Sequence, residues 1–289
     1  MAFSIILHIS GEEAVQGEVD DLPTTSDTMI KVSNPHKLDG KDVLGRTEGM
    51  YGNKLEVRTL FITYSSQHLD DLLNVISEAG VETIDVVASP IAASHMALSE
   101  RQKIVGCGLV NIGSETVSIA VFENGLLMSL RTFSIGSSDI TNDIALGLKI
   151  PLQEAEVLKL GNIFKDHSKK KLDEIIEARL SDIFELLENY LKKIKRNELL
   201  PAGIIFIGGG ANVSELEDLS KSFLKLPSKI GATEFFGNTK TKLRDPSYFV
   251  VLGLVVSSHD DNKYAEGSFS NLFNNLKNSV KSTIKQLMP

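Results

Sequence analysis

Apolar and polar residues alternate along this chain with two different periods, which predict both strands and helices. Short apolar or alternating runs predict strands at residues 4–9, 28–32, 55–63, 83–88, 104–109, 118–122, 126–135 and 204–207. Apolar residues three and four positions apart predict helices at residues 66–79, 91–99, 139–148, 151–160, 168–196 and 215–223. The continuously apolar run at residues 249–256 predicts one further buried segment.

The predicted helix at residues 168–196 is the longest, and Ser168 is a plausible N-cap for it. Lysines gather at both of its ends. They could bind an anion, but a solvated helix face is the simpler interpretation.

Composition excludes several classes of protein. The 289 residues are 42% hydrophobic and 24% charged, as in an ordinary globular protein. The single cysteine, Cys107, excludes a disulfide framework, a thiol redox pair and a cysteine-rich zinc site. A net charge of −8 argues against binding of nucleic acid. We find no secretory signal and no apolar run long enough to span a bilayer, and therefore expect a cytoplasmic protein.

Several common catalytic motifs are missing from the sequence. It contains neither G-x-x-x-x-G-K-[ST] nor G-x-G-x-x-G, the usual phosphate-binding loops. Its six histidines do not have metal-ligand spacing, so we expect no metal site. A nucleophile elbow of the G-x-S-x-G type is also missing, so no motif supplies the nucleophilic serine of a hydrolase triad.

Two predicted strands at residues 110–122 are joined by a small polar loop that holds Ser114 and Thr116. Successive backbone N–H groups in such a loop can bind phosphate, and the hydroxyls can add hydrogen bonds. An ordinary hairpin is the alternative interpretation.

A second turn follows the buried strand at 204–207 and contains three consecutive glycines, Gly208, Gly209 and Gly210, before a helix. Glycines allow a ligand to approach the backbone, and a helix N-terminus favours anions. A tight turn could need one glycine for structural reasons alone, whereas three favour contact with a ligand.

The order and spacing of these segments resemble the FtsA family of bacterial cell-division proteins, within the actin-like superfamily. The resemblance covers roughly residues 28–289 and rests on Leu55-Glu-Val, Ala88-Ser-Pro-Ile-Ala-Ala-Ser94, Asn111-Ile-Gly to Asn124-Gly125, Ile135-Gly136, Ile140-Thr-Asn-Asp-Ile-Ala145, Gly147-Leu148, Ala155-Glu156 with Lys159, and Gly208 to Ala211. It implies an α/β, actin-like (ribonuclease-H-like) ATPase fold, here N-terminally incomplete.

The resemblance also implies a division of the chain into parts. Residues 1–82 would hold an irregular N-terminus and the small strand-helix subdomain that FtsA inserts, which serves in self-association. Residues 83–103 would be a remnant of the first lobe and residues 104–262 the second lobe. Residues 263–289 would form a linker and an amphipathic helix.

The family binds ATP with Mg²⁺, and the resemblance carries this site over by position. Asn111, Gly113, Ser114, Glu115 and Thr116 would form the second phosphate loop. Glu156 and Lys159, one helical turn apart, would reach the ribose and adenine. The residues meeting the adenosine and its phosphates would be Gly208, Gly209, Gly210 and Ala211.

This sequence departs from the family pattern at the phosphates. Asn111 stands where the family has an aspartate that helps to hold Mg²⁺, and Glu115 would repel phosphate. Nothing before Leu55 resembles Asp-x-Gly-[ST], the first phosphate loop. These departures weaken the expectation of nucleotide binding and weaken that of hydrolysis further.

The C-terminal segment from Phe269 to Pro289 carries three lysines and no acidic residue. Its apolar residues form one continuous stripe at helical spacing, opposite a polar, cationic face. Such a helix suits an anionic membrane surface, although it could instead dock on the body of the protein. The predicted membrane-binding residues are Phe269, Leu272, Phe273, Leu276, Lys277, Val280, Lys281, Ile284, Lys285 and Leu287.

The resemblance and the tail together predict a peripheral protein on the inner face of the cell membrane at the division site. It would self-associate and tether FtsZ filaments to that membrane, without binding nucleic acid. Two alternatives of the same fold stay open: a pilus-assembly scaffold of the PilM type, and a phosphotransferase or ATPase that acts on a small molecule.

Overall fold

The computed structural model describes residues 26–33, 37–42, 50–56, 59–161, 169–233 and 242–257. The predicted strand at residues 4–9, the N-cap Ser168 and the whole C-terminal tail lie outside these residues.

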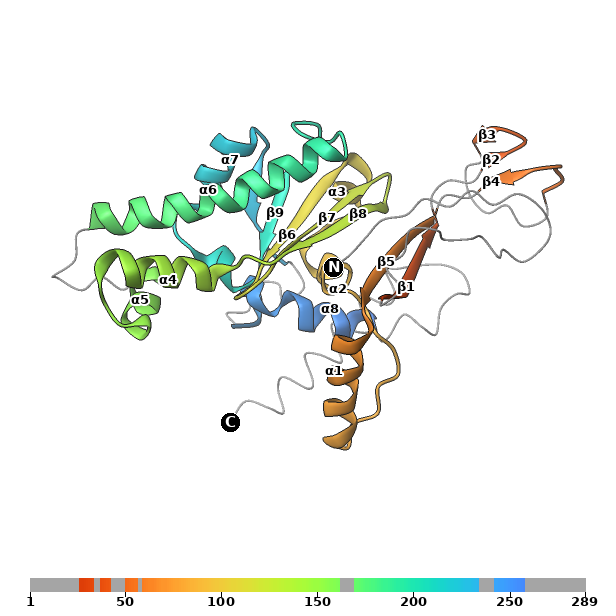
Figure 1. Ribbon diagram of the computed structural model, residues 1–289. Helices are drawn as coiled ribbons and strands as arrows, with labels where there is room; N and C mark the ends of the chain where they lie inside the picture. Colours follow the sequence, from red (N-terminus) through yellow and green to blue (C-terminus); the bar gives the residue numbers. More distant parts are fainter. Residues whose placement is uncertain are drawn as a thin grey trace.

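A five-stranded mixed sheet forms the centre of the molecule (Figure 1). Its strands lie in the order β10-β9-β6-β7-β8. Strands β6, β7 and β8, which run from the middle of the sheet to one edge, form an antiparallel meander. Strand β9 runs parallel to β6, and β10 runs parallel to β9. The bounds are β6 Cys107–Ile112, β7 Val117–Glu123, β8 Leu126–Phe133, β9 Ile204–Ile207 and β10 Ser228–Ile230.

Helices cover both faces of this sheet, so its three middle strands, β6, β7 and β9, are buried almost throughout. In Figure 1, α6 lies on one side of the sheet and α2 and α8 lie on the other. Residues of β6 alternate accordingly: Val110 and Ile112 join one apolar cluster, and Cys107 and Leu109 join the other. The helices are α2 Ser89–Ala97, α3 Glu100–Val105, α4 Ser137–Leu148, α5 Leu152–Lys159, α6 Lys169–Lys193, α7 Leu216–Leu224 and α8 Phe249–Ser257.

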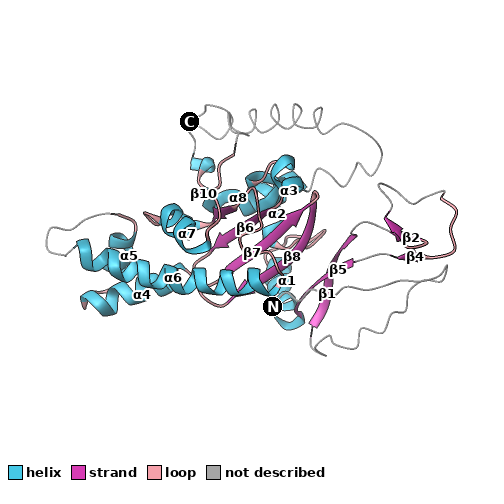
Figure 2. Ribbon diagram, turned by 90° about the horizontal axis from the view of Figure 1, so that it is seen from above, coloured by secondary structure: helices cyan, strands magenta, loops and turns pink. Residues whose placement is uncertain are grey.

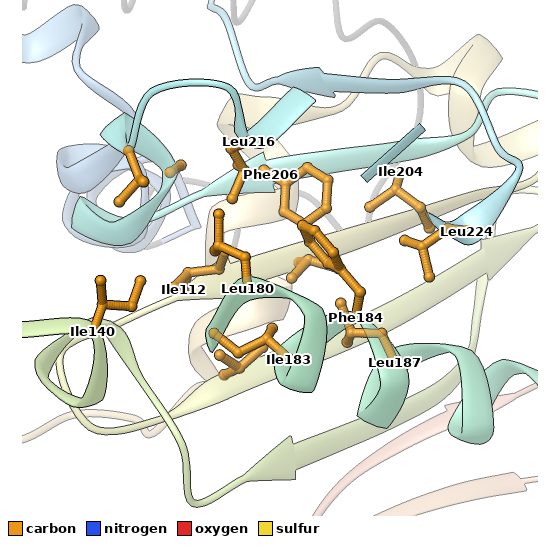
Figure 3. Packing of buried hydrophobic residues seen from close by; sticks show 14 of the residues in the cluster. Ile112, Ile140, Leu180, Ile183, Phe184, Leu187, Ile204, Phe206, Leu216 and Leu224 are labelled. Carbon is orange, nitrogen blue, oxygen red and sulfur yellow. The ribbon is translucent and has the colours of Figure 1, made fainter. Parts of the chain in front are cut away.

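The larger core cluster lies between α6 and the sheet. Phe184 of α6 is 1% exposed, and its ring centroid lies 6.2 Å from that of Phe206 on β9 (Figure 3). Leu180 and Leu187, one turn before and after Phe184, are fully buried in the same cluster. This packing explains why the helix remains regular over 25 residues although its other face is charged.

On the opposite face, α8 packs closely against α2. Gly253 makes this contact possible, because a Cβ atom there would lie 1.9 Å from the carbonyl oxygen of Ala92. Cluster residues beneath the sheet also include Leu60 and Ile62 of β5, which ties the N-terminal strands to this face.

The described N-terminal strands form two further sheets. β1 Ser26–Ser33 pairs antiparallel with β5 Thr59–Ser65, and β2 Lys37–Leu38 pairs with β3 Lys41–Asp42 and β4 Leu55–Glu56. Helix α1 Ser66–Glu78 follows β5 and extends away from the central sheet (Figure 1). Gly80, at φ +77°, ends it as predicted.

Most elements within the described ranges agree with the sequence prediction, but the strand at residues 83–88 is wrong. Residues 81–88 form no helix or strand, and Ile84 is 94% exposed. Apolar β-branched residues form a strand only when a neighbouring strand pairs with their backbone. Here the segment runs beside α1 instead.

Three other predictions need correction. The single strand predicted at residues 55–63 is two short strands, β4 and β5, in different sheets. Ile104 and Val105, predicted to begin a strand, belong to the end of α3. The run at residues 249–256 is helix α8, whose buried side holds Phe249 and Gly253 while Val251, at 60%, is exposed. None of the helices in the described part of the chain is long and apolar enough to cross a bilayer.

Candidate functional site

The loop between β6 and β7 closes on itself and then binds the start of α4. The N–H of Gly113 donates to the Thr116 carbonyl at 2.9 Å, which forms the hairpin turn. The N–H groups of Ser137 and Ser138 donate to the carbonyls of Gly113 and Ser114, at 2.9 and 2.8 Å. The loop is therefore held against the N-terminus of α4.

A second contact brings the same loop close to the residue before α4. A Cβ atom on Gly136 would lie 2.2 Å from the carbonyl oxygen of Ser114, so only glycine fits there. The hydroxyls of Ser114 and Ser138 lie 2.6 Å apart and form a hydrogen bond. These contacts fix the position of the Ser114 side chain.

The three glycines after β9 have different surroundings. Gly208 has φ +90°, and a Cβ there would lie 2.3 Å from Asn111 Oδ1. A Cβ on Gly210 would lie 2.3 Å from Ile112 Cγ2. A Cβ on Gly209 would meet nothing within 4 Å. Packing therefore explains the glycines at 208 and 210 but not the one at 209, which faces open space.

The turn from Gly208 leads into a short 3-10 helix, η1 Gly209–Asn212, which contacts a second one, η3 Pro246–Tyr248. Asn212 Nδ2 donates to the Asp245 carboxylate at 3.2 Å, and the N–H of Ser247 donates to the same group at 2.9 Å. Burial raises the pKa of Asp245, but these hydrogen bonds outweigh it and hold the pKa below its usual range. A third 3-10 helix, η2 Lys242–Arg244, precedes this cap.

Glu156 and Lys159 on α5 form an ion pair, with Lys159 Nζ 2.7 Å from Glu156 Oε2. The side chain of Lys159 is only 6% exposed, and Nζ also donates to Thr141 Oγ1 at 2.9 Å and to the Ser137 carbonyl at 3.1 Å. Thr141 Oγ1 in turn donates to Glu156 Oε2. The pair thus joins α5 to the first turns of α4.

These hydrogen bonds also determine the charge of Glu156. Partial burial raises the pKa of its carboxyl, but the hydrogen bonds from Lys159 and Thr141 and the charge of Lys159 more than offset that effect. The pKa of Glu156 therefore lies below its ordinary value, and the carboxylate stays ionised at neutral pH.

The loop, α4, α5 and the glycine turn enclose a pocket of about 370 Å³. Seven of its ten described lining residues have polar side chains, and two, Leu160 and Val213, have apolar ones. The described residues that line it are Ser114, Ser137, Ser138, Glu156, Lys159, Leu160, Gly209, Asn212, Val213 and Ser247.

Four of the residues predicted from the sequence share this pocket, namely Ser114, Glu156, Lys159 and Gly209. Asn111, Gly208 and Gly210 lie behind it and shape the turn. Gly113 anchors the loop, and Ala211 is fully buried. Glu115 and Thr116 are exposed at the tip of the hairpin, outside the pocket lining.

Sequence reasoning missed the other six lining residues. Ser137 and Ser138 carry a detectable signal, because Gly136 and Asp139 around them form a helix-capping pattern. Ser247 follows Asp245-Pro246, a cap with proline at the first helical position, which also predicts a helix start. Leu160, Asn212 and Val213 are neighbours of predicted residues and have no signal of their own.

The predicted membrane-binding residues, 269–287, lie outside the described part of the chain. Within the described ranges, no group of three or more histidine, cysteine, aspartate and glutamate side chains is arranged to hold a metal ion.

Comparison with known sequences identifies the family. The sequence model of the family "Cell division protein FtsA" matches residues 108–253, which is half of the chain and includes all ten described residues that line the pocket. The chain belongs to the FtsA family. This confirms the resemblance inferred from the sequence motifs.

Individual FtsA proteins match most of this chain. It is 30% identical to the cell division protein FtsA of Bacillus subtilis over 272 residues, which cover 82% of this chain and 60% of that protein. It is 24% identical to FtsA of Pseudomonas aeruginosa, with 81% and 62% covered. The chain therefore spans about three fifths of the length of these curated relatives.

Solved structures confirm the predicted actin-like α/β fold. The type IV pilus biogenesis complex PilM–PilN matches with a TM-score of 0.65 and 16% identity, covering 88% of this chain and 76% of that one. MreB5 of Spiroplasma citri bound to ADP matches with a TM-score of 0.57 and 16% identity, covering 70% and 69%. At such identities the likeness concerns the fold alone.

Proposed function

We propose that this chain is a cell-division protein that holds FtsZ filaments at the inner face of the cell membrane. Membership of the FtsA family supports the role in division. The observation that carries the membrane part of the proposal is the continuous apolar stripe from Phe269 to Leu287, beside three lysines and no acidic residue. FtsZ as the partner follows from the family.

The stripe explains attachment in physical terms. An interfacial helix buries its apolar side chains at the boundary between headgroups and acyl chains, and each lysine near an anionic surface adds about 1 kcal/mol. One such helix binds marginally, but several on one assembly bind together with much higher avidity. Self-association would therefore convert weak single contacts into stable attachment.

We propose that the self-associating part lies within residues 1–82, as an inserted subdomain. Residues 83–103 then belong to the first lobe, 104–262 form the second lobe, and 263–289 form the linker and tail. Helix α1 supports a surface for association, since it buries none of its side chains within the described structure. The apolar Leu72 and Val75 are 56% and 63% exposed.

A hollow beside α1 presents further exposed apolar side chains. It measures about 590 Å³ and lies between α1 and residues 81–86, where Val81 and Ile84 are 57% and 94% exposed. Exposed apolar side chains such as these, on α1 and on the segment beside it, are typical of protein contact surfaces. We propose that a second copy of this chain covers them.

We also propose that the pocket at Glu156 and Gly209 binds a nucleotide. The open position at Gly209 allows a ligand to approach the backbone, and the ionised Glu156 carboxylate can accept hydrogen bonds from a pair of sugar hydroxyls. These residues fit the sugar and base of ATP. The phosphate side fits less well, because Asn111 replaces a metal-binding carboxylate and Glu115 adds a negative charge.

The pilus-assembly alternative has the support of the fold alone, because the PilM–PilN complex is 16% identical. A phosphotransferase would need a carboxylate at the phosphate loop, where this chain has Asn111. The family match therefore favours cell division over both.

Flotation with vesicles tests the membrane proposal. The full chain is mixed with vesicles of phosphatidylglycerol and phosphatidylcholine, and with vesicles of phosphatidylcholine alone. We expect it to float with the anionic vesicles, and Phe273→Glu and Leu276→Glu to remain in the soluble fraction with unchanged circular dichroism.

The matched control is Asn278→Glu, which adds the same charge on the opposite side of the predicted helix. It should still float. Equal flotation of Phe273→Glu and the wild type, or flotation of neither, would overturn the proposal.

Sedimentation velocity tests self-association. Ile84→Lys and Leu72→Glu should shift the wild-type boundary to smaller sedimentation coefficients. The control Leu199→Glu, at a residue that is 63% exposed and distant in sequence from α1, should not. A wild type that sediments as a monomer at every concentration would contradict this part of the proposal.

A further inference from the structure

We infer that the pocket recognises the nucleoside part of its ligand, and that phosphates and Mg²⁺ add little to its affinity. This inference rests on the proposed nucleotide site and specifies what that site binds. It concerns four features: the cation in the pocket, the start of α4, the phosphate loop and the nucleoside side.

All three N–H donors of the cation in the pocket already have acceptors within the protein. Among the described residues lining the pocket, Lys159 alone is positively charged. An ammonium group has three N–H donors, and those of Lys159 meet three protein acceptors: Glu156 Oε2, Thr141 Oγ1 and the Ser137 carbonyl. A phosphate could gain Lys159 only if one of these hydrogen bonds broke.

The first backbone N–H groups of α4 also have acceptors within the protein. Backbone N–H groups at a helix N-terminus can bind phosphate, but those of Ser137 and Ser138 donate to the carbonyls of Gly113 and Ser114. The hydroxyls of Ser114 and Ser138 hydrogen-bond to each other, which uses one of their two protons. The loop therefore occupies both of these backbone donors and one of the two hydroxyl donors at this point.

The charge of the loop itself opposes phosphate. Asn111 is neutral, and its Oδ1 lies so close to Gly208 that a Cβ atom there would come within 2.3 Å. A neutral amide is a much weaker ligand for Mg²⁺ than a carboxylate. Glu115 is exposed at the tip of the hairpin, where its negative charge would repel a polyphosphate.

The part of the pocket that would hold a nucleoside, by contrast, offers both a hydrogen-bond acceptor and apolar surface. Both Thr141 and Lys159 bind Oε2 of Glu156, so that Oε1 has no partner within the described structure and can accept from a sugar hydroxyl. Leu160 and Val213 provide apolar surface for a base. The volume of about 370 Å³ lies within the range of small-molecule sites, so the pocket has room for a nucleoside.

Calorimetric titration of the full chain with adenosine, AMP, ADP and ATP tests the inference, each in Mg²⁺ and in EDTA. We expect dissociation constants within about threefold of one another and no effect of Mg²⁺. Affinity that rises more than about tenfold from adenosine to ATP, and needs Mg²⁺, would overturn the inference but support the nucleotide site. Failure of all four ligands to bind would overturn both, while the flotation result would be unaffected.

Two sets of variants strengthen this test. Gly209→Val places a side chain at a residue that lines the pocket, at a position where an added Cβ meets no atom within 4 Å, so it should abolish binding of adenosine and ATP alike, whereas Gly209→Ala should weaken both less. The pair Asn111→Asp and Glu115→Gly, combined in one chain, should create a Mg²⁺-dependent preference for ATP over adenosine. Unchanged selectivity in this double variant would contradict the claim that Asn111 and Glu115 weaken the binding of phosphate and Mg²⁺.

Discussion

Lys159 Nζ on α5 donates a hydrogen bond to the backbone carbonyl of Ser137 on α4, 3.1 Å away. The two helices lie side by side in both views of the ribbon (Figures 1 and 2). Because the N–H of Ser137 binds the hairpin loop through Gly113, one lysine connects α5, α4 and the loop. The arrangement of the pocket therefore depends on a residue that is itself almost buried.

We expect Lys159→Met to destabilise the fold by about 2 kcal/mol, because the change removes the charged donor that Glu156 and the Ser137 carbonyl share and leaves Thr141 as the remaining side-chain donor near both. Urea unfolding followed by circular dichroism measures this. The matched control is Lys192→Met. This lysine is exposed and pairs with the half-buried Glu188 near the surface, so the change should cost less than about 0.5 kcal/mol. Equal effects of the two changes would contradict the buried network.

The pH dependence of stability should show the contribution of Glu156. Its folded pKa lies below its ordinary value of 4.5, so the carboxylate stabilises the fold above that pH, and the contribution is lost as the pH falls through the folded pKa. The difference in free energy of unfolding between wild type and Glu156→Gln should therefore shrink between about pH 6 and about pH 3. A difference that stays constant over this range would contradict the ionised, hydrogen-bonded carboxylate.

Adjacent glycines should respond differently to substitution. Gly208→Ala forces a Cβ to within 2.3 Å of Asn111 Oδ1 at φ +90°, and we expect it to cost about 3 kcal/mol or more. Gly209→Ala meets no neighbour and should change the stability by less than about 1 kcal/mol. Thermal unfolding of the two variants distinguishes them, and a reversed order would show that the turn has a different conformation.

Cys107 should be unreactive in the native protein. It is fully buried on β6, and burial raises the pKa of its thiol to about 12, despite the opposing charges of Lys103 and Lys229. We expect iodoacetamide to label it more than about a hundredfold faster in guanidinium chloride than in native buffer at the same pH. Rapid labelling of the native chain would mean that this face of the sheet is open.

The central sheet and its helices could be predicted from the sequence because their signals are local. The run Ile204–Ile207 is uniformly apolar and ends in glycines, and α6 repeats its apolar residues at helical spacing. Both patterns depend on residues close together in the chain, and both elements are found where they were expected.

The wrong predictions concern properties that depend on distant partners. The run at residues 83–88 has strand-like composition, but no pattern within it shows whether a neighbouring strand will pair with it. In α8 every residue before Ser257 is apolar or glycine, so the sequence does not reveal that Val251 and Leu254 face outward.

The pocket could be predicted only in part for the same reason. The spacing of Glu156 and Lys159 places both on one side of a helix, but it does not show that Thr141 and Ser137 will use the other two protons of that lysine. Those contacts join residues 18 and 22 positions apart. They decide whether Lys159 is available to a ligand, and a sequence pattern does not contain them.

Recruitment of FtsZ to a supported bilayer tests the central claim most directly. Fluorescent FtsZ is polymerised with GTP above an anionic bilayer, and surface fluorescence is recorded with the full chain, with Phe273→Glu and with neither. We expect filaments at the bilayer only with the full chain. Absence of filaments from a bilayer that has bound the full chain would contradict the proposed tether.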